Sequence, residues 1–97
     1  MLHTLEQLRL RRSEILNITD KWGAYNVRVF GSFARGEADE DSDIDLLVNL
    51  KPGFTLMDLG GLLMDLQEFL GRKIDATTDG GLHWYIKDKI LKEAVKL

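Results

Sequence analysis

The segment from Asp43 to Leu50 restricts the fold of this chain more than any other, because apolar residues occupy every second position along it. Side chains of a β-strand point alternately to its two faces, so this pattern predicts a strand with one apolar face. The apolar face carries Ile44, Leu46, Val48 and Leu50, and the opposite face carries Asp43, Asp45, Leu47 and Asn49. Both aspartates therefore lie on the same side of a strand whose other side is buried.

A glycine–serine turn precedes this strand at short range. Residues 26–30 form a β-rich run that ends at Gly31 and Ser32, and six acidic residues follow within the nine positions from Glu37 to Asp45. A glycine lets the backbone approach a phosphate without a Cβ in the way, and a helix that begins at Ser32 would offer free N–H groups to an anion. Taken alone, the pair indicates no more than an ordinary strand-to-helix turn with a capping serine.

Asp43 and Asp45 are candidate metal ligands. Two carboxylates on one face of a strand repel each other unless a cation lies between them. Mg²⁺ binds one or two carboxylates together with phosphate oxygens and water. Acidic runs are usually solvated loops, but these two aspartates alternate with Ile44 and Leu46 and so belong to a buried strand. The sequence therefore favours a Mg²⁺–phosphate site formed by the aspartates and the glycine–serine turn.

A calcium-binding EF-hand loop is a competing interpretation of the acidic run. Asp39, Asp41 and Asp43 have the spacing of the first three EF-hand ligands. The EF-hand also requires a glycine at the sixth place and a glutamate at the twelfth. Ile44 and Leu50 occupy those two positions, so the EF-hand interpretation fails.

Asp75 is a third candidate carboxylate. It lies between Ile74 and Ala76 in a short strand expected over residues 73–77. Charged residues are uncommon in such strands without a partner. If this strand neighbours the strand of Asp45, Asp75 joins the other aspartates as a metal ligand or general base. An exposed aspartate on an edge strand is the alternative, and the spacing alone does not decide between the two.

The remaining pattern predicts helices between the strands. The expected helices cover residues 4–20, 32–36, 56–70 and 84–97, and the expected strands cover 26–30, 43–50 and 73–77. The order α-β-α-β-α-β-α predicts an α/β (α+β) fold, a small mixed sheet backed by helices, formed by one domain over residues 1–97. The third helix has Thr55 and Gly71 as caps and a leucine stripe at 56, 59, 63, 66 and 70. Gly60 and Gly61 lie inside this helix, so either a neighbouring element packs very closely there or the helix is locally soft.

Composition excludes several classes of protein. The chain has no cysteine, which excludes disulfides and thiolate metal sites and is consistent with a cytoplasmic protein. Its N-terminus lacks the apolar core of a signal peptide, and no apolar run approaches the ~20 residues of a membrane span. The net charge is −3, which gives no indication of direct nucleic-acid binding. The cluster Arg9, Arg11 and Arg12 is expected to form the solvated face of a helix.

Two motifs in order resemble a known family. Gly31-Ser32-Phe33-Ala34-Arg35-Gly36 is followed by Asp43-Ile44-Asp45-Leu46, with ten residues between Ser32 and Asp43. This arrangement resembles the nucleotidyltransferase superfamily of the DNA polymerase beta type. The short length and the final Lys-Asp-Lys-Ile-Leu-Lys-Glu-Ala resemble one branch, the minimal nucleotidyltransferases of HEPT/MNT toxin–antitoxin pairs.

The resemblance implies an activity and a role for each motif residue. Such enzymes bind ATP with Mg²⁺ and transfer AMP to a hydroxyl, which in the toxin–antitoxin branch lies on a helical HEPT-type toxin. Gly31 and Ser32 would bind the triphosphate, and Arg35 would help to bind the phosphate or stabilise the turn. Asp43 and Asp45 would ligate the metal, and Asp75 would be the third metal-binding carboxylate that helps to activate the attacking hydroxyl.

A contact-only antitoxin is the alternative function. Larger members of the superfamily add a helical domain that binds the acceptor, and this chain has none, so a partner protein is expected to complete the site in a hetero-oligomer. An inert module of the same fold would neutralise a HEPT-type toxin by binding alone. The complete set of Gly31, Ser32 and three aspartates favours the enzyme.

Overall fold

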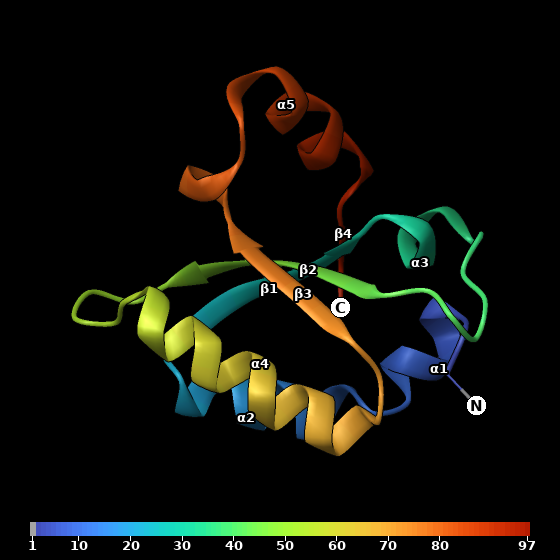
Figure 1. The fold of residues 1–97 in the computed structure, drawn as a ribbon, viewed down its shortest axis with the longest axis horizontal. Helices are drawn as coiled ribbons and strands as arrows, with labels where there is room; N and C mark the ends of the chain where they lie inside the picture. Colours follow the sequence, from blue (N-terminus) through green and yellow to red (C-terminus); the bar gives the residue numbers. More distant parts are fainter. Residues whose placement is uncertain (1) are drawn as a thin grey trace.

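A four-stranded mixed sheet organises the computed structural model, which describes residues 2–97. The strands are β1 (Ala24–Phe30), β2 (Ile44–Leu50), β3 (Ile74–Thr78) and β4 (Val95–Lys96), in the spatial order β3-β2-β1-β4. β1 pairs antiparallel with β2 and β4, whereas β2 and β3 run parallel (Figure 1). The predicted mixed sheet backed by helices is therefore confirmed.

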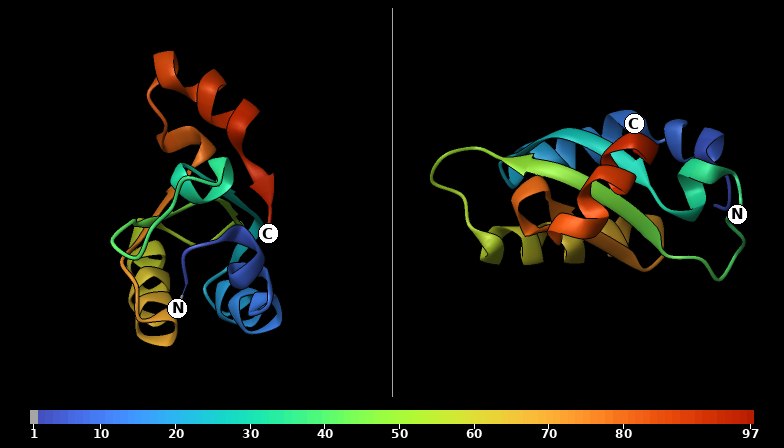
Figure 2. Two further views of the ribbon diagram at one scale, coloured as in Figure 1. Left: turned by 90° about the vertical axis from the view of Figure 1, so that its right-hand side faces the viewer. Right: turned by 90° about the horizontal axis from the view of Figure 1, so that it is seen from above.

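The helices divide unequally between the two faces of the sheet. Helices α2 (Arg12–Lys21) and α4 (Leu56–Leu70) lie side by side against one face, and α5 (Trp84–Glu93) stands over the other (Figures 1 and 2). The short helices are α1 (Leu5–Arg9), α3 (Ser32–Arg35) and the 3₁₀ turn η1 (Asp79–Gly81). No helix within residues 2–97 has the length and apolar character needed to cross a membrane.

The core lies between the sheet and the α2–α4 layer. Ile44, Leu46 and Val48 of β2 are at most 2% exposed, as the alternation predicts. α4 buries Leu59, Leu62, Leu66 and Leu70, each of which contributes roughly 1.5–3 kcal/mol by leaving water. Leu62 is fully buried, whereas Leu63 of the predicted stripe lies at the margin of the buried face and is only partly buried against the core. Leu56, which begins the helix beside an exposed turn, is 73% exposed.

The predicted continuous helix over residues 4–20 is wrong. A Thr4 capping box caps the N-terminal end of α1, and the helix breaks at Leu10 and Arg11, between α1 and α2. This break places Arg9 where its guanidinium donates hydrogen bonds to the carbonyls of Lys96 (2.5 Å) and Leu97 (3.2 Å). Arg9 therefore anchors the C-terminal backbone and is more than part of a solvated face.

The last helix ends earlier than expected and is followed by a strand. α5 stops at Glu93 because Ala94 is extended (φ −62°, ψ 135°). Val95 and Lys96 then pair with β1, the Leu97 N–H donates to the Val27 carbonyl, and the Leu97 side chain is buried. The extra strand β4 covers the outer edge of β1, which would otherwise present unpaired backbone groups.

The two adjacent glycines of α4 have different surroundings. A Cβ at Gly61 would lie 2.4 Å from the ring of Trp22, whereas a Cβ at Gly60 would meet nothing within 4 Å. Trp22 is held against α4 by its indole N–H, which donates to Asp65 Oδ2 at 2.8 Å. The prediction that a neighbouring element packs closely on this helix is therefore confirmed at Gly61.

We predict opposite effects for alanine at these two positions. Gly61→Ala forces the Trp22 ring to move and should lower the free energy of unfolding by about 1–3 kcal/mol. Gly60→Ala places a better helix former in open space and should raise it by about 0.5–1 kcal/mol. Urea unfolding of both variants measures the difference, and stabilisation by both would contradict the packing of Trp22 on Gly61.

Candidate active site

The sheet brings three separate chain segments to one place. Phe30, the last residue of β1, pairs with Asp45 near the start of β2, and Asp45 is in register with Asp75 of β3. Asp45 and Asp75 project from the face that α5 overhangs, because Ile44 and Ile74 beside them are buried in the core. Asp75 is an exposed residue on an edge strand, and it also neighbours Asp45, which is the condition for it to join the other aspartates.

The glycine–serine turn packs directly on Asp45. Gly31 has φ 73° and ψ −152°, a backbone conformation that favours glycine. A Cβ on Gly31 would lie 2.2 Å from Asp45 Oδ2, so only a residue without a side chain allows this approach. Helix α3 begins at Ser32 directly after this contact and ends at Gly36, which adopts the left-handed conformation.

Asp45 lies in an electrostatic setting that disfavours its charge. Burial, followed by the negative charges of Asp75 and Asp43, raises the pKa of Asp45 to about 6, and Arg35 opposes this only in part. A cation placed among these carboxylates would relieve the same repulsion. The site thus has an excess of negative charge that a hard metal ion would offset.

Asp43 lies at the mouth of the site. It precedes β2 by one residue, and its carboxylate is 3.7 Å from the ammonium of Lys73, with both side chains well exposed. An exposed ion pair of this kind contributes little to stability, so the pair with Lys73 would not prevent Asp43 from binding another cation.

Arg72 holds the acidic loop beside the site. Its guanidinium donates hydrogen bonds to the carbonyls of Ser42, Asp39 and Leu2. Within the loop, the Ser42 hydroxyl and the Asp41 N–H both donate to Asp39 Oδ1. Residues 37–42 are therefore anchored rather than free, a role of Arg72 for which the sequence gives no signal.

Glu93 is a site residue that the sequence did not indicate. The Gly31 N–H donates to Glu93 Oε2 (2.8 Å), and Arg35 Nη1 donates to Glu93 Oε1 (2.8 Å). Arg35 Nε also donates to Glu37 Oε1 at 2.6 Å. Burial acts to raise the pKa of Glu93, but the bonds from Arg35 and Gly31 outweigh it and the pKa is lowered. Glu93 therefore stays ionised at the turn, on a segment 62 residues further along the chain.

These groups line a cleft of about 590 Å³, a volume within the range of small-molecule sites. The lining residues are Phe30, Gly31, Ser32, Arg35, Asp41, Ser42, Asp43, Asp45, Ile86, Lys89, Ile90 and Glu93. Asp75 does not line this cleft but lies beside Asp45 on the neighbouring strand. The cleft thus combines acidic residues from the sheet with a lysine and two isoleucines from α5.

The aspartates do not form a complete metal cage by themselves. Within residues 2–97, no three acidic or histidine side chains are arranged to hold a metal ion. This arrangement fits Mg²⁺ chemistry, in which one or two carboxylates share the ion with substrate phosphates and water. The roles of Asp43, Asp45 and Asp75 as metal ligands remain predictions.

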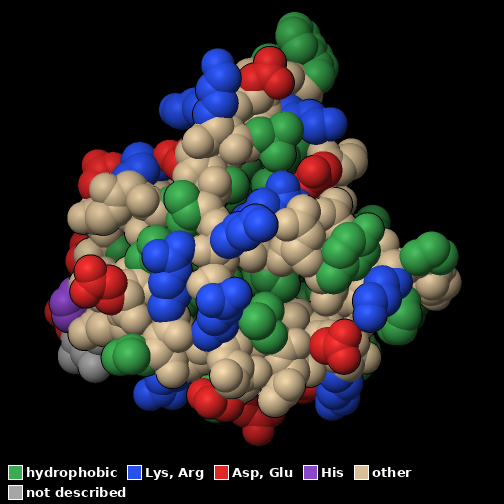
Figure 3. All heavy atoms as spheres, turned by 180° about the vertical axis from the view of Figure 1, so that it is seen from behind, with side chains coloured by type: hydrophobic (Ala, Val, Ile, Leu, Met, Phe, Trp, Pro, Cys, Tyr) green, Lys and Arg blue, Asp and Glu red, His purple; other side chains and the backbone are tan. Residues whose placement is uncertain are grey.

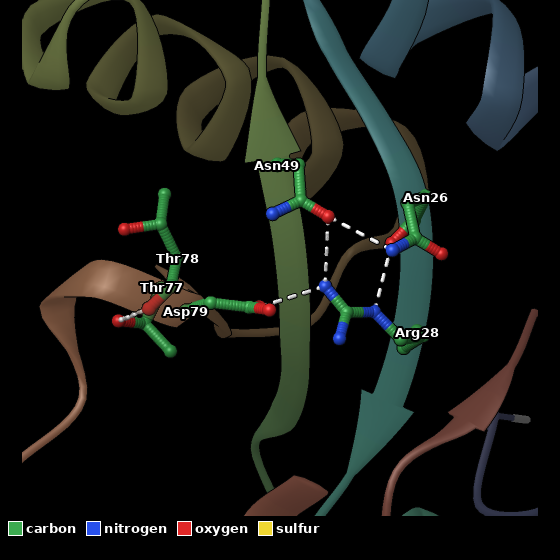
Figure 4. Close-up of polar contacts among 6 residues, drawn as sticks. All are labelled: Asn26, Arg28, Asn49, Thr77, Thr78 and Asp79. Atoms are coloured by element: carbon green, nitrogen blue, oxygen red, sulfur yellow. Dashed lines mark hydrogen bonds and ion pairs between the residues drawn. The ribbon is translucent and has the colours of Figure 1, made fainter. Parts of the chain in front are cut away.

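A second polar cluster lies further along the same face of the sheet (Figure 4). Arg28 Nη2 donates to Asp79 Oδ1 (2.8 Å) and to Asn49 Oδ1 (3.1 Å), and Arg28 Nε donates to the carbonyl of Asn26 (3.0 Å). Asn26 lies at an irregularity in the β1–β2 pairing and has a positive φ of 51°. The cluster fixes the far ends of β2 and β3 and so helps to keep Asp45 and Asp75 in register.

Comparison with known proteins identifies the family. The family model described as the nucleotidyltransferase domain matches residues 12–97 of the sequence. The chain belongs to the nucleotidyltransferase domain family. A candidate protein adenylyltransferase of Methanocaldococcus jannaschii is 43% identical over 87% of this chain and 90% of its own. The protein adenylyltransferase MntA of Thermococcus cleftensis is 32% identical over 95% and 94%.

Solved structures agree with this assignment. A structure described as a candidate minimal nucleotidyltransferase has a TM-score of 0.85 and 46% identity, and covers 97% of this chain and 96% of that one. A toxin–antitoxin crystal structure with AMP-PNP has a TM-score of 0.74 at 16% identity, over 87% of this nucleotidyltransferase and 69% of that chain. The second likeness shows a shared fold. Family membership supports a transferase activity for this nucleotidyltransferase.

We predict that Asp45 lowers the stability of the fold at neutral pH. Its pKa is raised from 3.8 to about 6 in the folded state, so stability falls as pH rises between these values. Asp45→Asn should therefore raise the free energy of unfolding by about 1–2 kcal/mol at pH 7.5, allowing for partial exposure, and by almost nothing at pH 3.5.

Chemical unfolding at the two pH values measures this effect. Asp88→Asn on the exposed surface of α5 is the matched control and should change stability by less than about 0.5 kcal/mol at both. A loss of stability in Asp45→Asn at pH 7.5 would contradict the repulsion described for the site.

Arg28 should matter for stability more than an exposed basic residue does. The Arg28 side chain is 13% exposed in its pair with Asp79, whereas Lys51 and Asp20 form a pair at 51% and 75% exposure. We expect Arg28→Met to cost about 1–3 kcal/mol because it leaves Asp79 without its partner and removes one of the two donors to Asn49 Oδ1. Lys51→Met should cost less than about 0.5 kcal/mol. Equal losses of unfolding free energy in the two variants, measured by thermal or urea unfolding, would show that the Arg28 cluster adds no stability beyond that of an exposed ion pair.

Proposed function

We propose that this chain transfers AMP from ATP to a hydroxyl of a partner protein, a helical HEPT-type toxin, and thereby acts as its antitoxin in the cytoplasm. The observation that carries the proposal is the contact of the Gly31 turn with Asp45, with Asp75 in register beside it. The names of the protein adenylyltransferase relatives support the protein acceptor. The toxin–antitoxin structures with this fold support the partner class.

Different residues of the cleft would bind the triphosphate and the metal ion. Ser32 and the N-terminal end of α3 would bind the triphosphate, with Gly31 keeping the backbone close and Arg35 supporting the turn. Asp43 and Asp45 would hold Mg²⁺ together with phosphate oxygens, and Asp75 would complete the carboxylate set. When bound, Mg²⁺ supplies positive charge that neutralises the phosphates.

The transfer itself is a displacement at the α-phosphorus of ATP. The acceptor hydroxyl oxygen forms a bond to this phosphorus while the bond to the bridging oxygen of the β-phosphate breaks, and pyrophosphate leaves. Asp75, which is exposed at the edge of the sheet, would accept the proton of the attacking hydroxyl. An exposed base suits an acceptor that arrives on another protein.

The proposal is tested by intact mass spectrometry. We would incubate the chain with ATP and Mg²⁺, with and without the protein encoded beside it. We expect mass gains in AMP-sized steps on the partner. Loss of about 4 kcal/mol of charge stabilisation slows transfer roughly a thousandfold, so Asp43→Asn and Asp45→Asn should show no detectable gain. Asp88→Asn, a matched change on exposed α5, should modify the partner at the wild-type rate.

The same experiment separates the two functions. A stable complex whose partner gains no mass would favour neutralisation by contact alone. Turnover retained in both Asp43→Asn and Asp45→Asn would contradict the metal assignment.

A further inference from the structure

We infer that Glu93, at the C-terminal end of α5, is a positioning residue for nucleotide binding: it acts through Arg35 and the Gly31 turn and does not touch the nucleotide. This inference rests on the proposed function, because it concerns the same cleft. It assigns a role to the last turn of α5, which lies far from both sequence motifs.

Glu93 uses both carboxylate oxygens on the phosphate-binding turn. Oε2 accepts the N–H of Gly31, and Oε1 accepts Nη1 of Arg35, each at 2.8 Å. The two bonds join the start of α3 to its last residue through a single carboxylate. Hydrogen bonds to an ionised group are among the stronger ones in proteins. Glu93 therefore restrains the turn in the positive-φ conformation that places it against Asp45.

The arrangement keeps Ser32 available. Within residues 2–97, the Ser32 hydroxyl makes no hydrogen bond, although Gly31 and Arg35 on either side are both engaged. Arg35 forms ion pairs with both Glu93 and Glu37, so two carboxylates already offset its single positive charge. A carboxylate that merely occupied the phosphate position would compete for the Ser32 donor as well. The contacts thus indicate a support beside the binding groups.

The chain after Glu93 explains how its position is held. Val95 and Lys96 pair with β1, and the Arg9 guanidinium bonds the last two carbonyls. By contrast, α5 itself buries none of its residues, and Trp84 and Tyr85 are 80% and 66% exposed. Figure 3 shows hydrophobic side chains at the projecting end of the molecule that α5 forms. Glu93 is therefore fixed by β4, next to β1, more than by the packing of its own helix.

Calorimetric binding of Mg²⁺–ATP tests the inference. Glu93→Ala removes both bonds and should weaken binding roughly ten- to a hundredfold. Glu93→Gln keeps an oxygen that accepts the Gly31 N–H but loses the charge that holds Arg35, so it should fall between wild type and Glu93→Ala. Asp88→Asn removes the other carboxylate of α5, which faces solvent, and should bind like wild type.

A double-mutant cycle separates positioning from a general structural role. If Glu93 acts through Arg35, adding Arg35→Ala to Glu93→Gln should weaken binding by much less than the product of the two single effects. The protection of the Gly31 amide against hydrogen exchange should fall in Glu93→Ala and stay unchanged in Asp88→Asn. Should Glu93→Ala prove too unstable, Glu93→Gln carries the test.

The outcomes distinguish this inference from the proposed function. Tighter Mg²⁺–ATP binding in Glu93→Ala would show a competitor for phosphate and overturn the inference, as would unchanged binding in both Glu93 variants. A wild type that binds Mg²⁺–ATP in a Glu93-dependent way, yet modifies no partner, would refute the proposed function alone.

Discussion

The contact between Gly31 and the carboxylate of Asp45 is the constraint on which the rest of this site depends. It requires β1 and β2 to be antiparallel neighbours, with Phe30 opposite Asp45, so that the turn after one strand meets the start of the other. It also requires a glycine at a positive φ, since any Cβ would strike the carboxylate. The parallel pairing of β2 with β3 then brings Asp75 beside Asp45. Three distant segments thereby form one acidic site next to the N-terminal end of α3.

The site concentrates like charges, and the remainder of the fold offsets their repulsion. Asp45 is half-buried among Asp43 and Asp75, and Glu93 adds a further negative charge nearby. The opposite face of the same strands packs Ile44, Leu46 and Val48 against the leucines of α4, which supplies the stability. Perturbed carboxylates in a cleft are typical of functional sites, where the missing charge arrives with the substrate or metal. The layered architecture thus separates a stabilising face from a reactive one.

Local patterns predicted most of this architecture, and long-range pairing accounts for what they missed. The alternation in β2, the caps of α4 and the glycine–serine turn are properties of neighbouring residues, so the sequence alone indicated them correctly. The strand β4 depends on its pairing with β1, and Arg9 bonds carbonyls 87 or more positions away; no local period contains such contacts. Glu93 was missed for the same reason, because a lone glutamate near the end of a helix resembles a solvated residue. The neighbourhood of Asp75 and Asp45 required the strand order, which the spacing left open.

A crystal soaked with Mn²⁺ and a non-hydrolysable ATP analogue would test the central claim most directly. Mn²⁺ replaces Mg²⁺ among oxygen ligands and is located by anomalous scattering. The account predicts an anomalous peak coordinated by the carboxylates of Asp43 and Asp45, with triphosphate density on Ser32 and the start of α3. Metal and triphosphate bound elsewhere on the molecule, with Asp45 still facing Gly31 alone, would contradict it.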